Sequence, residues 1–236
     1  MKIALVHDWL VNLSGAERVL LELHKIFPDA PIYTLFQNEK FTSQYFPDTE
    51  IRSSFLQKIP GINKYYKYFF FLMPTAIESF DLSDFDLVIS SSAIFSKGLV
   101  LKPKTKHICY CYSPTRQIWD LNAIKDYGFS IRNTLINLSK HFLRIWDQQA
   151  SDRVDEFVAI SEHVRRRINK YYRRDSVVIY PPVSIKYPVS SIKEEKLIHD
   201  TKYLIPNTDF YLIVSRLFPD NRRRSGTRAV KTANRN

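Results

Sequence analysis

Two short motifs combine an indole ring with a carboxylate, a pair of groups that suits a carbohydrate ligand. Asp8 and Trp9 follow an apolar run at the N-terminus, and Trp119 and Asp120 follow a second such run. The ring can stack on a sugar face, and the carboxylate can accept hydrogen bonds from sugar hydroxyls. Arg116, in the second motif, can pair with a phosphate. In the alternative interpretation, Asp8 caps a turn, Trp9 belongs to the core, and Arg116 and Asp120 form a surface pair.

A glycine-containing turn lies between the first predicted strand, Lys2–Val6, and the first predicted helix, Ala16–Phe27. Gly15 allows a ligand to approach the backbone, and a helix N-terminus offers free N–H groups and the positive end of its dipole. The turn is therefore a candidate site for a phosphate or a sugar hydroxyl. The chain has only five glycines and no G-x-G-x-x-G motif, which disfavours the usual dinucleotide-binding fold.

These motifs need strands and helices that alternate along the chain. The clearest unit is residues 157–183, where an apolar strand precedes a helix that begins after Ser161, and a second strand ends at Pro181 and Pro182. The pattern predicts an α/β fold, Rossmann-like, with a mainly parallel sheet and helices on both faces. Further strands are expected at 31–36, 86–90 and 107–112, and a long helix at 129–150. Ligands of such sheets bind at the carboxyl ends of the strands.

The formal charge of +11 suits anionic partners such as nucleotide phosphates, acidic lipids or nucleic acid. Cys109 and Cys111 are expected to be free, buried thiols. The sequence shows no signal peptide and no membrane-spanning apolar run, so we expect a cytoplasmic protein that can lie on the inner face of the membrane. The aromatic and basic run Lys64–Phe71 is either a membrane-surface segment or a partly buried helix. Common hydrolase, Walker and zinc motifs are absent from the sequence.

The chain is expected to comprise an N-terminal domain at 1–183, a linker at 184–208 and the first strand of a truncated second domain at 209–219. Residues 220–236 carry five arginines, one lysine and one aspartate, a net charge of +5, without apolar periodicity. We expect this tail to be disordered. The alternative is a basic tail that binds nucleic acid or acidic lipids.

Six segments in order resemble the N-terminal half of a family 4 glycosyltransferase with the GT-B fold. They are residues 2–20, 86–99, 107–120, 152–172, 177–183 and 211–217. The resemblance is strongest to bacterial members that build O-antigen, capsule or exopolysaccharide, often mannosyltransferases. It implies an acceptor-side Rossmann-like domain that faces a donor domain across a cleft. It also implies a retaining transfer from a nucleotide-sugar to a glycolipid or oligosaccharide acceptor, with no metal and no cofactor.

The resemblance, together with the motifs above, assigns the site residues. Asp8, Tyr112 and Arg116 are the expected catalytic residues, and Arg216 is expected to meet the donor phosphate. Substrate contacts are expected from eight further residues: Trp9, Gly15, Ala16, Glu17, Arg18, Ser113, Trp119 and Asp120.

The sequence also departs from the family pattern. Tyr112 stands where similar members usually carry histidine, and a tyrosine cannot provide histidine's proton chemistry near neutral pH. The family's lysine would fall near Asn221 or Arg222, and its paired-glutamate motif is absent. We therefore expect the isolated chain to be inactive or nearly so. The alternatives are a non-catalytic acceptor-binding or membrane-associated domain and a basic nucleic-acid-binding protein.

Overall fold

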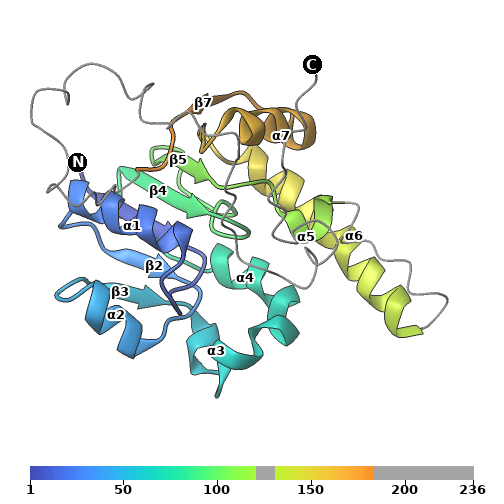
Figure 1. Cartoon of the computed structure of the whole chain (residues 1–236), viewed down its shortest axis with the longest axis horizontal. Helices are drawn as coiled ribbons and strands as arrows, with labels where there is room; N and C mark the ends of the chain where they lie inside the picture. The colour runs from blue at the N-terminus through green and yellow to red at the C-terminus, as the bar shows by residue number, and fades with distance from the viewer. Residues whose placement is uncertain (121–130, 183–236) are drawn as a thin grey trace, which may run out of the picture. The chain divides into compact units, whose positions relative to one another are not determined.

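A computed structural model of the chain describes residues 1–120 and 131–182 and shows one parallel sheet of seven strands in that part (Figure 1). The order is β3-β2-β1-β4-β5-β6-β7, and every neighbouring pair is parallel. The strands are β1 (Ile3–His7), β2 (Ile32–Thr34), β3 (Ile51–Ser53), β4 (Leu87–Ser92), β5 (Lys106–Cys111), β6 (Glu156–Ala159) and β7 (Ser176–Val178). The predicted Rossmann-like α/β class is confirmed.

Helices cover both faces of this sheet. They are α1 (Gly15–Ile26), α2 (Glu39–Tyr45), α3 (Ile62–Tyr65), α4 (Met73–Glu78), α5 (Arg116–Trp119), α6 (Ile131–Asp152) and α7 (Glu162–Tyr172), with 3-10 segments η1 (Phe55–Lys58) and η2 (Tyr66–Leu72). Side chains alternate along β1, since successive strand residues point to opposite faces. Ala4 and Val6 pack into the cluster that contains α4, whereas Leu5 packs into the cluster that contains residues of α1 and α2.

The strand–helix–strand unit at the far edge forms as predicted. The Ser161 side chain accepts a hydrogen bond from the Val164 backbone N–H at 3.3 Å, which caps α7. The final strand is shorter than the predicted 177–180, because β7 ends at Val178. Ile179 and Tyr180 are 53% and 65% exposed, although the Ile179 backbone N–H still donates to the Ala159 carbonyl oxygen at 3.0 Å.

Five elements were not predicted from the sequence, namely β3, α2, η1, α4 and α5, and neither was the 3-10 character of η2. Cys109 and Cys111 are free and buried, as expected. Among the described helices, none is long and apolar enough to cross a membrane.

The compact unit that contains the sheet spans Met1–Val183. The predicted linker at 184–208, the strand at 209–219 and the tail at 220–236 lie outside the described residues.

Candidate functional site

The strand order of the sheet reverses at β1. The chain adds β2 and β3 on one side of β1 and then returns to add β4 and β5 on the other side. Ligands of parallel α/β sheets bind at such a switch point, outside the carboxyl ends of the strands. This edge carries His7 at the end of β1, Ser91 and Ser92 at the end of β4, and Tyr112 just after β5.

A closed ring of polar contacts joins these strand ends to the start of α1. The Tyr112 hydroxyl donates to the Ala16 carbonyl oxygen at 3.0 Å and lies 2.8 Å from the Ser91 hydroxyl. The Ser91 hydroxyl lies 3.0 Å from Nδ1 of His7, and Nε2 of His7 lies 3.6 Å from a Glu17 carboxylate oxygen. The glycine turn is therefore attached to three neighbouring strands.

Burial and nearby charges determine the protonation states of Glu17 and Tyr112. Burial alone would raise the pKa of Glu17, but the hydrogen bond and the charge interaction with His7, and the hydrogen bond from Ser14, hold it below its ordinary value. Glu17 also accepts a hydrogen bond from the Ser14 backbone N–H at 2.9 Å, which fixes the first turn of α1. Burial raises the pKa of Tyr112 well above its ordinary value, so its hydroxyl stays protonated and positions the turn.

Gly15 has no packing reason to be glycine. A Cβ built on it meets no atom within 4 Å, and its φ angle is not in the left-handed region. The residue is exposed at the first position of α1, where an alanine would favour the helix. The fold therefore leaves open space directly above the backbone at the start of the helix.

Asp8 is buried, and its carboxylate accepts hydrogen bonds from the backbone of the loop that follows β4. One carboxylate oxygen accepts the backbone N–H groups of Ala93 and Ile94, each at 2.8 Å, and the other accepts those of Phe95 and Ser96, each at 2.7 Å. Four bonds use the acceptor positions of a carboxylate. The geometry indicates that Asp8 stabilises the shape of this loop. This role is similar to the alternative in which Asp8 caps a turn, but the loop lies far away in the sequence.

Trp9 is half-buried and packs against other aromatic rings. Its ring stacks on Phe36 at 5.7 Å between centroids with a 13° interplanar angle, and it contacts Tyr66 at 5.3 Å. It lies against the apolar cluster that includes α4. This packing favours the alternative in which Trp9 belongs to the core.

Trp119 and Asp120 also have protein partners. The Trp119 indole N–H donates to Asp147 at 2.7 Å, and its ring lies 4.9 Å from that of Tyr171. Asp120 accepts a hydrogen bond from Arg167 of α7 at 2.7 Å, and not from the expected Arg116. The structure therefore uses the second indole–carboxylate motif to attach the loop after β5 to α6 and α7.

A buried charged group that sequence reasoning missed organises this region. Asp147 of α6 pairs with Lys97 at 2.6 Å, and both side chains are 1% exposed. The same carboxylate accepts hydrogen bonds from Thr115 at 2.8 Å and from the Tyr172 hydroxyl at 2.7 Å. Burial would lower the pKa of Lys97, but the charge and hydrogen bond of Asp147 outweigh burial and raise it. No sequence motif joins these positions, since they come from four separate segments.

The remaining expected site residues are spread more widely. Arg18 and Arg116 are exposed, and Ser113 is buried with its hydroxyl donating to the Pro114 carbonyl at 2.9 Å. Arg216 lies outside the described residues. In the described ranges, no three His, Cys, Asp or Glu side chains gather as ligands for a metal ion.

The arginines of the α7 region are largely engaged within the molecule. Arg165 pairs with Glu162 at 2.9 Å, and Arg167 pairs with Asp120. Arg174 donates to four backbone carbonyls at the end of α6 and just after it, at 2.6 to 3.3 Å. Cations at a helix C-terminus satisfy free carbonyls and oppose the helix dipole. These contacts favour a structural role for the basic helix.

Comparison with known proteins decides the family. Residues 13–187 match the family described as Glycosyltransferase Family 4. The chain belongs to glycosyltransferase family 4. Solved structures of Anabaena HepE, in complex with UDP and in complex with UDP and glucose, are similar to it with 14% and 12% sequence identity and TM-scores of 0.42 and 0.40. Both alignments cover 78% of this chain but only 44% and 45% of HepE. No curated protein matches the chain significantly.

The family 4 match contains the glycine turn, Ser91, Tyr112 and the Asp147 cluster, but neither His7 nor Asp8. The structure brings four of the expected site residues together at one edge, namely Gly15, Ala16, Glu17 and Tyr112. It directs Trp9, Trp119 and Asp120 to protein partners. Their contact with a substrate stays a prediction for this family 4 chain.

Proposed function

We propose that this chain takes part in transferring a sugar from a nucleotide-sugar to a lipid-linked or oligosaccharide acceptor during surface polysaccharide synthesis. Membership of glycosyltransferase family 4 supports the class of reaction. The proposal includes a retaining outcome and a hexosyl donor such as a mannosyl one. It needs neither a metal ion nor another cofactor, and it fits a protein that works in the cytoplasm.

The observation that carries the proposal is the turn at Gly15. The closed ring of polar contacts that includes Tyr112 connects its backbone to β1, β4 and β5, so the turn is rigid at the switch point of the sheet. The space above Gly15 is open, and the first N–H groups of α1 lie beside it. A sugar hydroxyl or a phosphate oxygen can therefore reach the backbone at the positive end of a helix of 12 residues.

In this proposal, Tyr112 and Glu17 position the backbone of the glycine turn. Tyr112 holds the Ala16 carbonyl, and Glu17 holds the Ser14 N–H, so both sides of the turn are fixed before the ligand arrives. A preformed site avoids the cost of ordering a loop on binding. Asp8 acts further back, because it shapes the loop 93–96 that lies behind the strand ends.

The test compares Gly15→Val with the wild-type chain. Ligand-observed NMR with oligosaccharide and glycolipid acceptors and with UDP- and GDP-sugars measures binding, and a transfer assay with the same donors measures turnover. We expect the wild-type chain to bind an acceptor glycan and Gly15→Val to bind at least about tenfold more weakly, since the new side chain fills the open space. Circular dichroism should show the same fold for both proteins.

Glu39→Val is the matched control, because it changes the exposed first residue of α2 and should leave binding unchanged. Equal binding by Gly15→Val and wild type would exclude the glycine turn as the site. A wild-type chain that binds no sugar and no nucleotide-sugar from the panel would refute the proposed function itself.

A further inference from the structure

An exposed row of aromatic side chains runs along the segment formed by α3 and η2. Tyr65, Tyr68 and Phe71 are 47%, 77% and 64% exposed, which is unusual for three large rings so close in sequence. A 3-10 helix has about three residues per turn, so side chains three apart lie above one another. The three rings therefore form one continuous row, named here the aromatic row.

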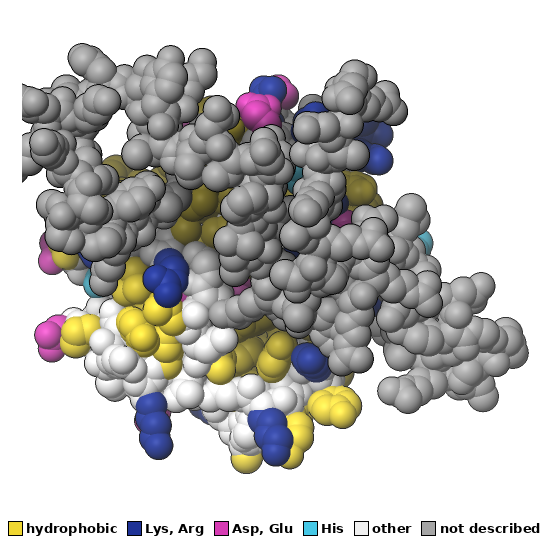
Figure 2. Space-filling model, viewed as in Figure 1, with side chains coloured by type: hydrophobic (Ala, Val, Ile, Leu, Met, Phe, Trp, Pro, Cys, Tyr) yellow, Lys and Arg dark blue, Asp and Glu magenta, His cyan; other side chains and the backbone are white. Residues whose placement is uncertain are grey.

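The other apolar side chains of the segment face the core. Tyr66, Phe69 and Leu72 pack against the apolar cluster that includes α4, and so does Phe70, which lies in the same row as Lys64 and Lys67. Lys64 and Lys67 are exposed and lie in the row next to the aromatic row. Each has no carboxylate partner among the described residues, and the Lys64 ammonium lies 5.4 Å from the centre of the Tyr65 ring. Figure 2 shows apolar and basic side chains together along the lower margin of the molecule, over this segment.

We propose that the aromatic row and Lys64 and Lys67 form a docking surface for an anionic lipid bilayer. Tyrosine and phenylalanine rings partition into the headgroup region of a membrane, and lysines extend to the lipid phosphates beside them. The lysines favour a negatively charged occupant, because a bilayer of acidic lipids attracts each basic group near its surface.

The segment that carries this surface contacts the loop after β1. The inner face of η2 reaches the loop after β1, where the Tyr66 ring lies 5.3 Å from that of Trp9. Trp9 follows Asp8 at the carboxyl end of β1. Docking would therefore hold this edge of the sheet close to the bilayer. If the proposed function is correct, the acceptor is lipid-linked, but membrane binding itself does not depend on sugar transfer.

The test is co-sedimentation of the full chain with vesicles in the absence of sugars. We expect binding to vesicles in which about a third of the lipid is phosphatidylglycerol, and little binding to pure phosphatidylcholine. The double variant Tyr68→Ser/Phe71→Ser should lower the partition coefficient at least about tenfold. The double variant Lys64→Gln/Lys67→Gln should lower it about fivefold for each lysine and weaken its dependence on salt.

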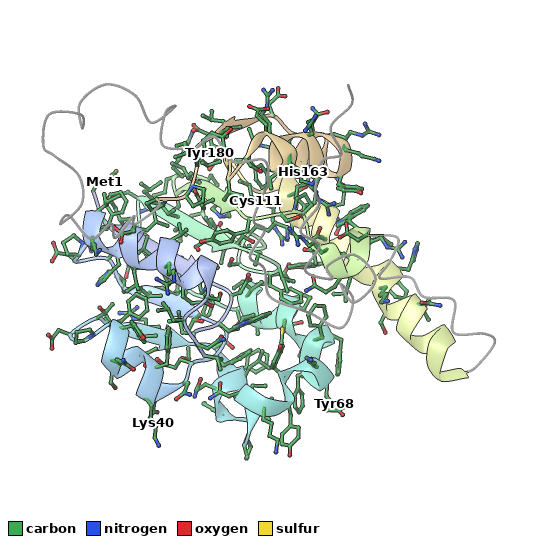
Figure 3. The ribbon with its side chains drawn as sticks, viewed as in Figure 1. Met1, Lys40, Tyr68, Cys111, His163 and Tyr180 are labelled. Atoms are coloured by element: carbon green, nitrogen blue, oxygen red, sulfur yellow. The ribbon has the colours of Figure 1, made fainter. Side chains whose placement is uncertain are left out.

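Matched controls come from the rest of the surface. Tyr180 is 65% exposed and lies far from Tyr68 in Figure 3, so Tyr180→Ser should bind like the wild type. Lys102 and Lys104 are exposed lysines in another loop, and Lys102→Gln/Lys104→Gln should have at most a small effect.

Three results would overturn the docking surface. The first is a wild-type chain that does not sediment with anionic vesicles, and the second is equal sedimentation of the aromatic-row variants. The third is a chain that stays unbound while the aromatic-row variants convert a dimer into a monomer in size-exclusion chromatography. That result would identify a second copy of the chain as the occupant. All these measurements leave the proposed sugar transfer untouched.

Discussion

Replacing Asp8 with asparagine separates a structural carboxylate from a catalytic one. The two oxygens of Asp8 each accept two backbone N–H groups from residues 93–96 at 2.7 or 2.8 Å. An asparagine keeps one oxygen and turns an NH₂ group toward the other two donors. Two charge-assisted hydrogen bonds are lost, and two buried N–H groups lose their acceptor.

The magnitude follows from the hydrogen bonds that the substitution removes. A hydrogen bond to a charged group contributes about 1.5–3 kcal/mol, so Asp8→Asn should lower the free energy of unfolding by about 3–6 kcal/mol. Urea unfolding followed by circular dichroism measures this change as a lower midpoint at an unchanged slope. Asp81→Asn is the control, because exposed Asp81 accepts a hydrogen bond from the Ser83 backbone N–H and its loss should leave the unfolding midpoint close to that of the wild type.

The opposite result would contradict this reasoning. If Asp8→Asn unfolds within about 1 kcal/mol of wild type but no longer binds sugar, the carboxylate acts on the ligand. The sequence-based assignment of Asp8 as a catalytic residue would then stand. A large loss of stability places Asp8 among the groups that build the loop behind the site.

Three further substitutions test the buried polar groups and the close packing of the loop after β4 against α6. Lys97→Met leaves Asp147 buried without its cation and should lower the free energy of unfolding by about 3–5 kcal/mol, as measured in urea; the double variant with Asp147→Asn should recover part of that loss. Burial lowers the pKa of His107 from 6.5 to about 4, so the unfolded chain binds a proton first as the pH falls. At roughly 1.4 kcal/mol per pH unit, the free energy of unfolding should drop by about 3 kcal/mol between neutral pH and pH of about 4, and His107→Gln should remove this part of the drop in a pH series. Gly98→Ala places a Cβ in steric conflict with the Trp146 ring, so the thermal midpoint should fall by several degrees, and an unchanged midpoint would show that the ring moves freely.

The parallel sheet could be predicted because its signals are local. Apolar runs of strand length, the cap at Ser161 and the stop at Pro181 each depend on neighbouring residues in the chain, and the structure confirms the unit that they delimit. Short elements with weaker patterns, such as β3 and α2, form because the neighbouring strand and the core stabilise them. Their periodicity alone is too brief to detect.

The roles of the polar residues were decided by the tertiary structure. The amino-acid sequence by itself determined every described strand except β3, the long helices α1, α6 and α7, and that the carboxyl ends of the strands meet at one edge beside Gly15. It could not determine where Asp8 and Trp119 find their partners, which lie at residues 93–96 and at Asp147. Hydrogen bonds depend on atoms being within about 3 Å of each other, and only the folded chain brings together groups that are many residues apart.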